Sequence, residues 1–133
     1  DHSLARPAFE ESLRLESSVQ TFFRTSSRDT ELMGVRIPQD SKVVTFLAAA
    51  NRDERQWPQP ERYDIQRRPV GHMAFGSGIH GCVGQVVARL EGELVLTALA
   101  KRVKRIELVG EPQRRLNNTL RALGSMPVRL IPA

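Results

Sequence analysis

The sequence predicts an α+β fold, in which short β-strands lie between two helices and continue after the second one. Apolar residues recur at helical spacing in two segments, residues 8–16 and 83–98. Short runs of β-branched and aromatic residues, separated by turn residues, fill positions 19–47 and return after residue 105. With 133 residues, of which 40% are hydrophobic, the chain has the length and composition of one domain, residues 1–133.

The first half of the chain contains one predicted helix and several predicted strands. The helix covers residues 8–16, with Pro7 near its start and apolar residues on one face. Met33-Gly34 and Pro38-Gln39-Asp40 are turn signals within the segment 19–47. The strands there are therefore expected to be short.

The second half begins with an irregular stretch and continues with the clearest helix of the sequence. Residues 51–69 contain three prolines and many charges without a sustained period, which predicts a loop. The helix that follows the glycine-rich segment is predicted from an apolar stripe that is expected to pack in the core: Val83, Val87, Leu90, Leu94 and Ala98. Short strands are expected at residues 105–109, 118–120 and 128–131, with a turn around Gly124 joining the last two.

Composition and charge argue against several classes of protein. Cys82 is the only cysteine, so the chain has no internal disulfide and no multi-cysteine zinc site, as expected in a reducing cytoplasm. No segment approaches the roughly 20 consecutive apolar residues of a membrane span, and the N-terminus lacks the apolar core of a signal peptide. A soluble, cytoplasmic protein is therefore expected. The net charge of +5 favours an acidic partner or an anionic ligand, but the scattered basic residues argue against nucleic-acid binding.

The only cysteine lies in a glycine-rich segment, FGSGIHGCVG, at residues 75–84. Its four glycines let the backbone adopt positive φ angles and let a flat ligand approach closely. The helix predicted after this segment directs free amide hydrogens and the positive end of its dipole at Cys82, which favours the thiolate. Such a sulfur is a nucleophile or a soft ligand of a transition metal, whereas a lone cysteine is otherwise a small buried apolar residue.

The neighbouring residues favour heme among these interpretations. A nucleophile needs a base within hydrogen-bond reach, but His80 is two residues away, and His2 and His72 belong to no motif. Zinc needs more nitrogen or sulfur ligands than one cysteine supplies. Heme iron needs only one strong protein ligand, and a cysteine thiolate has that role in oxygen-activating enzymes. A cysteine beside a glycine-lined surface therefore fits heme best.

Three motifs resemble those of the cytochromes P450. Residues 75–84 resemble the heme-binding signature of that family, F-x-x-G-x-[RH]-x-C-x-G, at every fixed position. Glu11-Ser-Leu-Arg14 resembles the E-x-x-R pair of the family's K helix, and Pro60-Glu-Arg-Tyr63 resembles its meander motif. The motifs occur in the family's order and approximate spacing, so the resemblance covers essentially the whole chain. It implies the part of a mostly helical P450 fold that runs from the K helix to the C-terminus, with short strands and one long L helix.

The resemblance implies heme b as the cofactor and assigns residues to it. The residues implied to bind heme are Cys82, His80, Arg24, Phe75, Gly76 and Gly84. Among them, Cys82 would be the axial iron ligand and the catalytic residue, and Phe75 the ring beside it that limits solvent. Arg24 and His80 would bind the heme propionates, since a guanidinium fork matches a carboxylate.

Two further groups of residues follow from the resemblance. The first, a buried network that holds the meander loop under the heme, consists of Glu11, Arg14 and Arg62. The second, which would line the distal pocket and contact a small organic substrate, consists of Val19, Phe22 and Leu120. Breaking one member of the charged network is expected to damage folding and heme retention, because a buried charge needs its partners.

The implied activity is that of a monooxygenase, which inserts one oxygen atom of O2 into a substrate C–H bond. Several stretches resemble bacterial soluble members that hydroxylate or O-demethylate para-substituted benzoates such as 4-methoxybenzoate; they are residues 16–25, 49–55, 82–93 and 115–127. A ferredoxin-type protein is the implied electron donor. The basic residues that are candidates for docking it on the sulfur side are Arg67, Arg68 and Arg102.

The resemblance also implies that a larger part is missing. Family members are much longer, and the N-terminal part absent here would carry the I helix, whose acid–alcohol pair in an A-G-x-[DE]-T pattern delivers protons during catalysis. No such pattern occurs in these 133 residues, so they are expected to be inactive alone. Two alternatives stay open: a heme-binding sensor or carrier without monooxygenase activity, and a cofactor-free basic adaptor in which Cys82 has no role.

Overall fold

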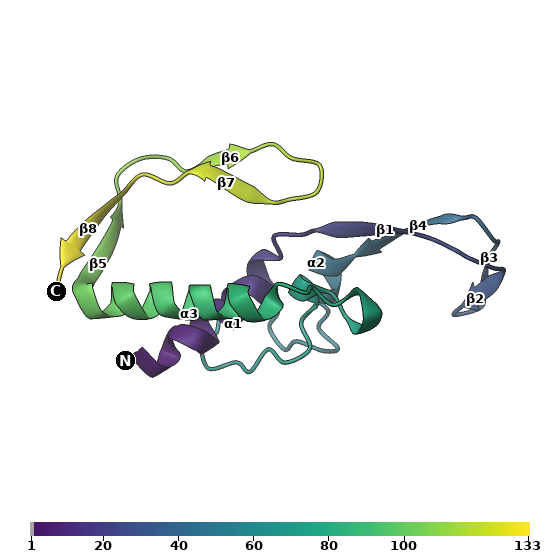
Figure 1. The fold of residues 1–133 in the computed structure, drawn as a ribbon, viewed down its shortest axis with the longest axis horizontal. Helices are drawn as coiled ribbons and strands as arrows, with labels where there is room; N and C mark the ends of the chain where they lie inside the picture. Colours follow the sequence, from purple (N-terminus) through teal and green to yellow (C-terminus); the bar gives the residue numbers. More distant parts are fainter. Residues whose placement is uncertain (1) are drawn as a thin grey trace.

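Two helices lie side by side at the centre of the computed structural model, which describes residues 2–133 (Figure 1). Helix α1 (Ala5–Glu16) follows a single 3-10 turn, η1 (His2–Leu4). Helix α3 (Gln85–Arg102) is the long helix predicted after the glycine-rich segment. The strands extend from this centre as two separate arms, one on either side.

Helix α1 begins and ends where its sequence allows. It starts three residues before the predicted segment 8–16, with Pro7 in its first turn, where an amide hydrogen has no partner within the helix. Its last turn is closed by Ser17, whose left-handed backbone (φ 42°) lets its amide donate to the Leu13 carbonyl at 3.0 Å. The helix therefore stops just before the strand segment.

Within residues 2–133 the strands pair antiparallel, in four separate two-stranded sheets. The pairs are β1 (Thr21–Thr25) with β4 (Lys42–Phe46), β2 (Thr30–Leu32) with β3 (Val35–Ile37), β5 (Val103–Leu108) with β8 (Val128–Pro132), and β6 (Gln113–Arg115) with β7 (Ala122–Ser125). The predicted turn at Met33-Gly34 closes the β2–β3 hairpin, with φ angles of 50° and 80° at these two residues. The short strands predicted for residues 19–47 are thus confirmed.

The segment between the β1–β4 arm and α3 is irregular, as predicted for residues 51–69. The described chain contains no helix or strand between α2 (Leu47–Ala50) and the 3-10 turn η2 (Met73–Phe75). Another 3-10 turn, η3 (Gly78–His80), follows η2 and leads towards α3. The glycine-rich segment therefore lies between the irregular loop and the long helix.

The C-terminal arm, residues 103–133, differs from its prediction at three places. Gly124 lies within β7 and not in a turn, and the chain instead passes from β7 to β8 through Met126 and Pro127. The predicted strand 118–120 is reduced to one bridge between Leu120 and Val19. Strand β6 was missed because its sequence, Gln-Arg-Arg, has no apolar alternation.

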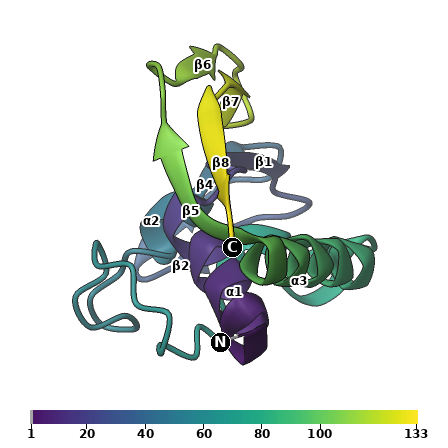
Figure 2. The same cartoon turned by 90° about the vertical axis from the view of Figure 1, so that its left-hand side faces the viewer.

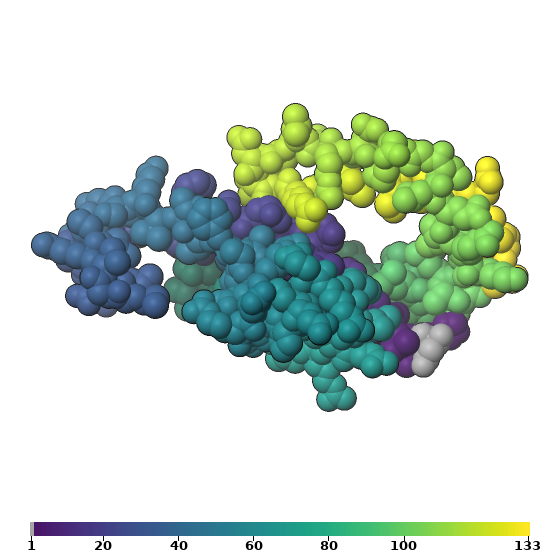
Figure 3. All heavy atoms as spheres, turned by 180° about the vertical axis from the view of Figure 1, so that it is seen from behind, coloured from purple at the N-terminus to yellow at the C-terminus, as the bar shows by residue number. Residues whose placement is uncertain are grey.

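The C-terminal arm leaves the helices and returns to them. Figure 2 shows β5 and β8 rising from the end of α3, with β6 and β7 beyond them. In the space-filling view of Figure 3, this arm arches away from the helical part. Its tip comes back to the start of β1, where the Arg121 amide donates to the Ser18 carbonyl at 2.7 Å.

Few apolar residues are buried within this chain. Among the described residues, the apolar side chains that are buried are those of Ala5, Leu47, Trp57 and Pro69. The stripe on α3 that was expected to pack in the core does not: Val87, Leu90 and Leu94 are 59%, 54% and 58% exposed. Periodicity identifies an apolar face but not what covers it, and the described chain does not cover this one.

Candidate functional site

The main chain around Cys82 is fixed by hydrogen bonds that close the glycine-rich loop. The Cys82 amide donates to the Phe75 carbonyl at 2.8 Å, and the Gln85 amide donates to the Cys82 carbonyl at 3.3 Å. Gly76 has φ 70°, and a Cβ atom there would lie 2.7 Å from the His80 carbonyl oxygen, so the loop requires glycine at this position. The thiol itself is exposed, which leaves it free to bind a ligand.

Cys82 lines an open hollow of about 860 Å3 between the helices and the β1–β4 arm. This volume is in the range of about 300–1,000 Å3 that is typical of small-molecule and cofactor sites. Seven of the residues predicted to bind heme or substrate line it: Cys82, His80, Arg24, Phe75, Gly76, Val19 and Phe22. The fold therefore brings together residues as far apart in the sequence as Val19 and Cys82.

Two of the predicted residues lie outside the lining of this hollow. Leu120 adjoins it through its bridge to Val19. Gly84 follows Cys82 on the way into α3, and a Cβ atom there would be 3.8 Å from the Cys82 sulfur, an ordinary contact. The Cys82 sulfur therefore leaves room for a side chain at position 84, and this contact does not explain why glycine occurs there.

The donor set around the hollow suits a flat, largely apolar ligand with acidic substituents. The lining is mostly apolar, and it includes a thiol, a guanidinium and an imidazole from Cys82, Arg24 and His80. The Arg24 guanidinium donates to the Phe23 carbonyl at 2.9 Å and lies 5.4 Å from the centre of the Phe22 ring. A sulfur ligand for a soft metal and cations for carboxylates are the groups that a metalloporphyrin needs.

A buried ion pair on α1 supports the irregular loop. Glu11 and Arg14 are both fully buried, and two parallel hydrogen bonds of 2.8 Å join them. Burial alone would raise the pKa of the Glu11 carboxyl, but hydrogen bonds from Arg14 and the Asp64 amide outweigh it and lower that pKa. Arg14 also donates to the Asn51 carbonyl at 2.7 Å, which ties the helix to the start of the loop.

The third member of this network is Arg67 and not Arg62. The Arg67 guanidinium donates to Glu11 at 3.1 Å and also binds the carbonyls of Pro58 and Gln59. Arg62 is exposed and contributes only its carbonyl, 3.4 Å from Arg14. The prediction for Arg62 is wrong because a tight turn, in which its amide donates to the Gln59 carbonyl, leaves its side chain on the outside.

The position of Arg67 also bears on the residues that were predicted to dock a ferredoxin-type electron donor. Arg67 is only 12% exposed and each nitrogen of its guanidinium donates a hydrogen bond within the chain, so it offers little surface for docking. Arg102 is at the far end of the 18-residue helix α3, which at about 1.5 Å per residue puts it roughly 25 Å from the start of the helix beside Cys82. Of the three candidates, Arg68 is the one that remains exposed and within the loop.

Sequence reasoning missed Asn51, a buried residue that joins three segments. Its amide nitrogen donates to the Ser17 hydroxyl at 2.8 Å, and its amide oxygen accepts from the Met73 amide at 2.6 Å. The end of α1 is thereby connected to η2, which leads into the cysteine loop. The available signal was weak: an asparagine directly after an apolar helical segment, where it ends α2.

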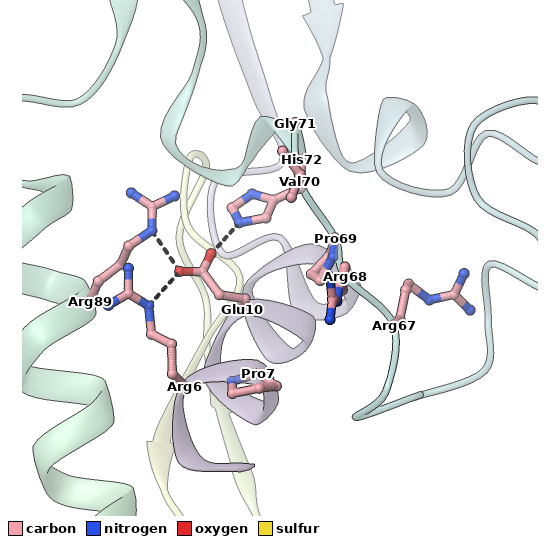
Figure 4. A pocket seen from close by; sticks show the side chains of 10 residues that line it. All are labelled: Arg6, Pro7, Glu10, Arg67, Arg68, Pro69, Val70, Gly71, His72 and Arg89. Carbon is pink, nitrogen blue, oxygen red and sulfur yellow. Dashed lines mark hydrogen bonds and ion pairs between the residues drawn. The ribbon is translucent and has the colours of Figure 1, made fainter. Parts of the chain in front are cut away.

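A second group that the sequence did not reveal surrounds Glu10 on α1. Figure 4 shows its carboxylate between Arg6, Arg89 and His72, beside a hollow of about 380 Å3. Because 62 and 79 positions separate His72 and Arg89 from Glu10, no local pattern could indicate that they meet.

Comparison with known proteins identifies the family. The family model described as cytochrome P450 matches residues 3–127. This chain belongs to the cytochrome P450 family. The P450 family uses heme as its cofactor, as the sequence predicted.

The relatives of this P450 chain include several bacterial proteins. Cytochrome p450 CYP199A2 of Rhodopseudomonas palustris is 61% identical over 133 residues, which are 100% of this chain and 32% of that protein. The 6-deoxyerythronolide B hydroxylase of Saccharopolyspora erythraea is 41% identical and shares 98% of this chain and 33% of its own length. The chain thus spans about a third of the length of the curated relatives it matches.

Solved structures confirm the predicted fold class. Cytochrome P450 CYP109Q5 from Chondromyces apiculatus superimposes with a TM-score of 0.91 at 41% identity, covering 100% of this chain and 35% of that one. CYP108D1 from Novosphingobium aromaticivorans gives a TM-score of 0.93 at 38% identity, covering 100% and 32%. In the part of the P450 chain described here, no helix is long and apolar enough to cross a membrane.

Proposed function

We propose that this chain is the heme-thiolate part of a P450 monooxygenase, with Cys82 as the axial ligand of the heme iron. The observation that supports it most is that Cys82, which is exposed, lines the large hollow. The chain's only cysteine thus faces a space of suitable size, with a guanidinium and an imidazole among the lining residues.

The residues around the hollow have separate proposed roles. Arg24 and His80 bind the heme propionates, which are carboxylates suited to cationic and hydrogen-bonding partners. Phe75 covers the sulfur side and limits water there, and Gly76 lets the loop turn close to the macrocycle. Gly84 is the remaining proposed heme contact, at the start of α3. When bound, thiolate-ligated heme supplies the chemistry that favours cleavage of the O–O bond.

The substrate side of the hollow is proposed to include Val19, Phe22 and Leu120. Val19 and Phe22 line the hollow, and the bridge from Val19 holds Leu120 beside it. Apolar side chains there exclude water and orient a small organic molecule. In the proposed reaction, one oxygen atom enters a substrate C–H bond and the other leaves as water, with two protons and with two electrons from a ferredoxin-type partner.

These 133 residues are proposed to act as the C-terminal heme-thiolate segment of a longer enzyme. They span about a third of their relatives, and the apolar residues on α3 lie exposed, as expected for a surface that a further part of the protein covers. That further part would carry the proton-delivering groups and most of the substrate pocket. The segment alone is expected to be inactive as a monooxygenase.

We propose a small para-substituted aromatic acid as the substrate, which the enzyme hydroxylates or O-demethylates. The support is the similarity of residues 16–25 and 115–127 to P450s that act on such acids. Relatives named as hydroxylases support the reaction type. The test is turnover of 4-methoxybenzoate by the full-length enzyme with reductant and ferredoxin. Formaldehyde and 4-hydroxybenzoate are the expected products, and their absence alongside turnover of another substrate would reject this class.

The absorption spectrum of the reduced, carbon-monoxide-bound full-length protein tests the heme assignment. A thiolate-type band that Cys82→Ser abolishes is the expected result. A protein that shows the band but oxidises no substrate would instead be a heme-binding sensor or carrier. A colourless protein, with or without Cys82, would be a cofactor-free adaptor.

A further inference from the structure

We propose that Glu10 and Arg89 are positioning residues that hold Phe75, and through it the cysteine loop, against α1. We call Glu10, His72 and Arg89 the Glu10 clamp. The role rests on the proposed function, because Phe75 adjoins the proposed iron ligand. The geometry of the clamp itself does not depend on heme.

Glu10 is the only carboxylate of the clamp, and each of its oxygens serves a different partner. One oxygen accepts from the Arg89 side chain at 2.6 Å and the other pairs with the His72 ring at 2.9 Å. Glu10 is 17% exposed and His72 only 2%, so water competes weakly for these bonds. The carboxylate thus joins α1 to α3 and to the loop before η2 (Figure 4).

His72 connects Glu10 to the turn that carries Phe75. Its Nδ1 accepts from the Ala74 amide at 3.2 Å, so the ring hydrogen of the neutral form is on Nε2 and is donated to Glu10. The His72 side chain thereby caps η2, whose last residue is Phe75. The His72 and Phe75 rings also lie near each other, with their centroids 6.2 Å apart.

Arg89 connects Glu10 to the Phe75 ring itself. Its guanidinium carbon is 4.7 Å from the ring centroid, a cation–π distance. The same guanidinium donates to the Gln85 side chain at 2.7 Å, which fixes it along the first turns of α3. Both sides of the Glu10 clamp therefore meet at Phe75, whose carbonyl accepts the Cys82 amide at 2.8 Å.

Glutamate is required at position 10 by the hydrogen-bond donors on both sides. Arg89 and His72 both present N–H groups to it, so both oxygens must be acceptors. A glutamine would place its NH2 group against one of these donors and lose that bond. The pKa of Glu10 is consistent with a carboxylate that accepts on both sides. Burial alone would raise this pKa, but the hydrogen bonds from His72 and Arg89 outweigh burial and lower it.

Arg6 offers a matched control within the same site. It donates to the same Glu10 oxygen as Arg89, at 3.2 Å, but from the exposed side, where its own side chain is 49% exposed. Its second partner is Glu93 on α3, at 3.1 Å, and not an aromatic ring. Arg6→Gln and Arg89→Gln therefore make the same chemical change and remove one bond each from one oxygen, but only the second removes the cation from Phe75.

The experiment compares Arg89→Gln, Glu10→Gln and Arg6→Gln in the full-length heme-loaded protein. The readouts are the midpoint potential of the heme and hydrogen exchange at the amides of Ala74 and Cys82. Arg89→Gln and Glu10→Gln are expected to shift the potential and to speed Cys82 exchange by about tenfold, whereas Arg6→Gln leaves both near wild type. Arg89→Lys keeps a positive charge near the Phe75 ring, so its midpoint potential is expected to lie between those of Arg89→Gln and the wild type.

The outcomes separate this role from the proposed function. Equal potentials and exchange rates for Arg89→Gln and Arg6→Gln would overturn the clamp even if the thiolate band is present and depends on Cys82. If the thiolate band is absent, the proposed function fails, and the exchange rates alone still decide whether the clamp holds the loop. If Arg89→Gln does not fold, Glu10→Gln decides: faster Cys82 exchange in this variant supports the clamp, and a wild-type rate overturns it.

Discussion

The two central helices differ in how far they are buried within this chain, and the difference shows where the chain depends on further structure. Helix α1 buries Glu11 and Arg14 completely and satisfies both from within the chain. Helix α3 has no buried residue, and it exposes Val87, Leu90 and Leu94 by more than half. The polar network around α1 is therefore complete as it stands, whereas the apolar face of α3 needs a cover.

The largest effect is expected from Arg14→Ala, which removes a member of the buried polar network around α1. It would leave the Glu11 carboxylate buried without its bidentate partner, which typically costs about 3–5 kcal/mol. Heme absorbance during urea unfolding of the full-length protein measures the loss. Arg62→Ala is the control and should stay within about 0.5 kcal/mol of wild type, because the Arg62 side chain is exposed. Comparable damage from both substitutions would restore Arg62 to the network.

The exposed apolar face of α3 is tested by making Leu94→Ala in the full-length protein and in the isolated chain. In the full-length protein, where further chain is proposed to cover α3, the loss of a buried leucine should cost about 2–4 kcal/mol. In the isolated chain, where Leu94 is 58% exposed, the change should stay within about 0.5 kcal/mol. Urea unfolding followed by circular dichroism measures both. Equal changes in the two contexts would show that nothing covers this face.

The contact between the two helices is tested by Gly92→Ala. A Cβ atom at Gly92 would lie 2.4 Å from the Phe9 ring, so either this ring or the two helices would have to move. Alanine normally stabilises a helix by about 1 kcal/mol relative to glycine, whereas overpacking here should cost about 1–3 kcal/mol. Thermal unfolding gives the sign, and adding Phe9→Leu should recover part of the loss. A rise in stability for Gly92→Ala alone would contradict the close packing.

The smallest effect is a pH dependence that arises from Glu10. Its pKa is lower in the folded chain than the ordinary 4.5, so its contribution to stability is present above pH 4.5 and is lost as pH falls through the folded pKa. Unfolding free energy measured from about pH 6 down to about pH 3 should therefore fall less steeply for Glu10→Gln than for wild type. Parallel curves for the two proteins would mean that Glu10 is not held by His72 and Arg89.

The sequence predicted those features that local patterns encode. The glycines and Cys82 lie within one short segment, so the amino-acid order by itself is enough to locate the loop and its cysteine. The helix of residues 85–102 and the turn at Met33-Gly34 likewise follow from neighbouring residues. Each of these predictions depends on contacts or backbone angles within a few positions of the chain.

The features that were predicted wrongly or missed depend on contacts between distant segments. Whether Arg62 or Arg67 reaches Glu11 is decided by the path of an irregular loop, which no periodic pattern describes. Glu10 meets His72 and Arg89 only because α1, the loop and α3 converge. The apolar stripe on α3 was identified correctly as a face, but its cover lies outside the described contacts.

The most direct measurement is X-ray absorption fine structure at the iron edge of the heme-loaded, full-length protein. If Cys82 is the axial ligand, the spectrum contains one sulfur neighbour of iron, and this neighbour disappears in Cys82→Ser. An iron with only nitrogen or oxygen neighbours in the wild-type protein, or a sulfur neighbour that survives Cys82→Ser, would contradict the account.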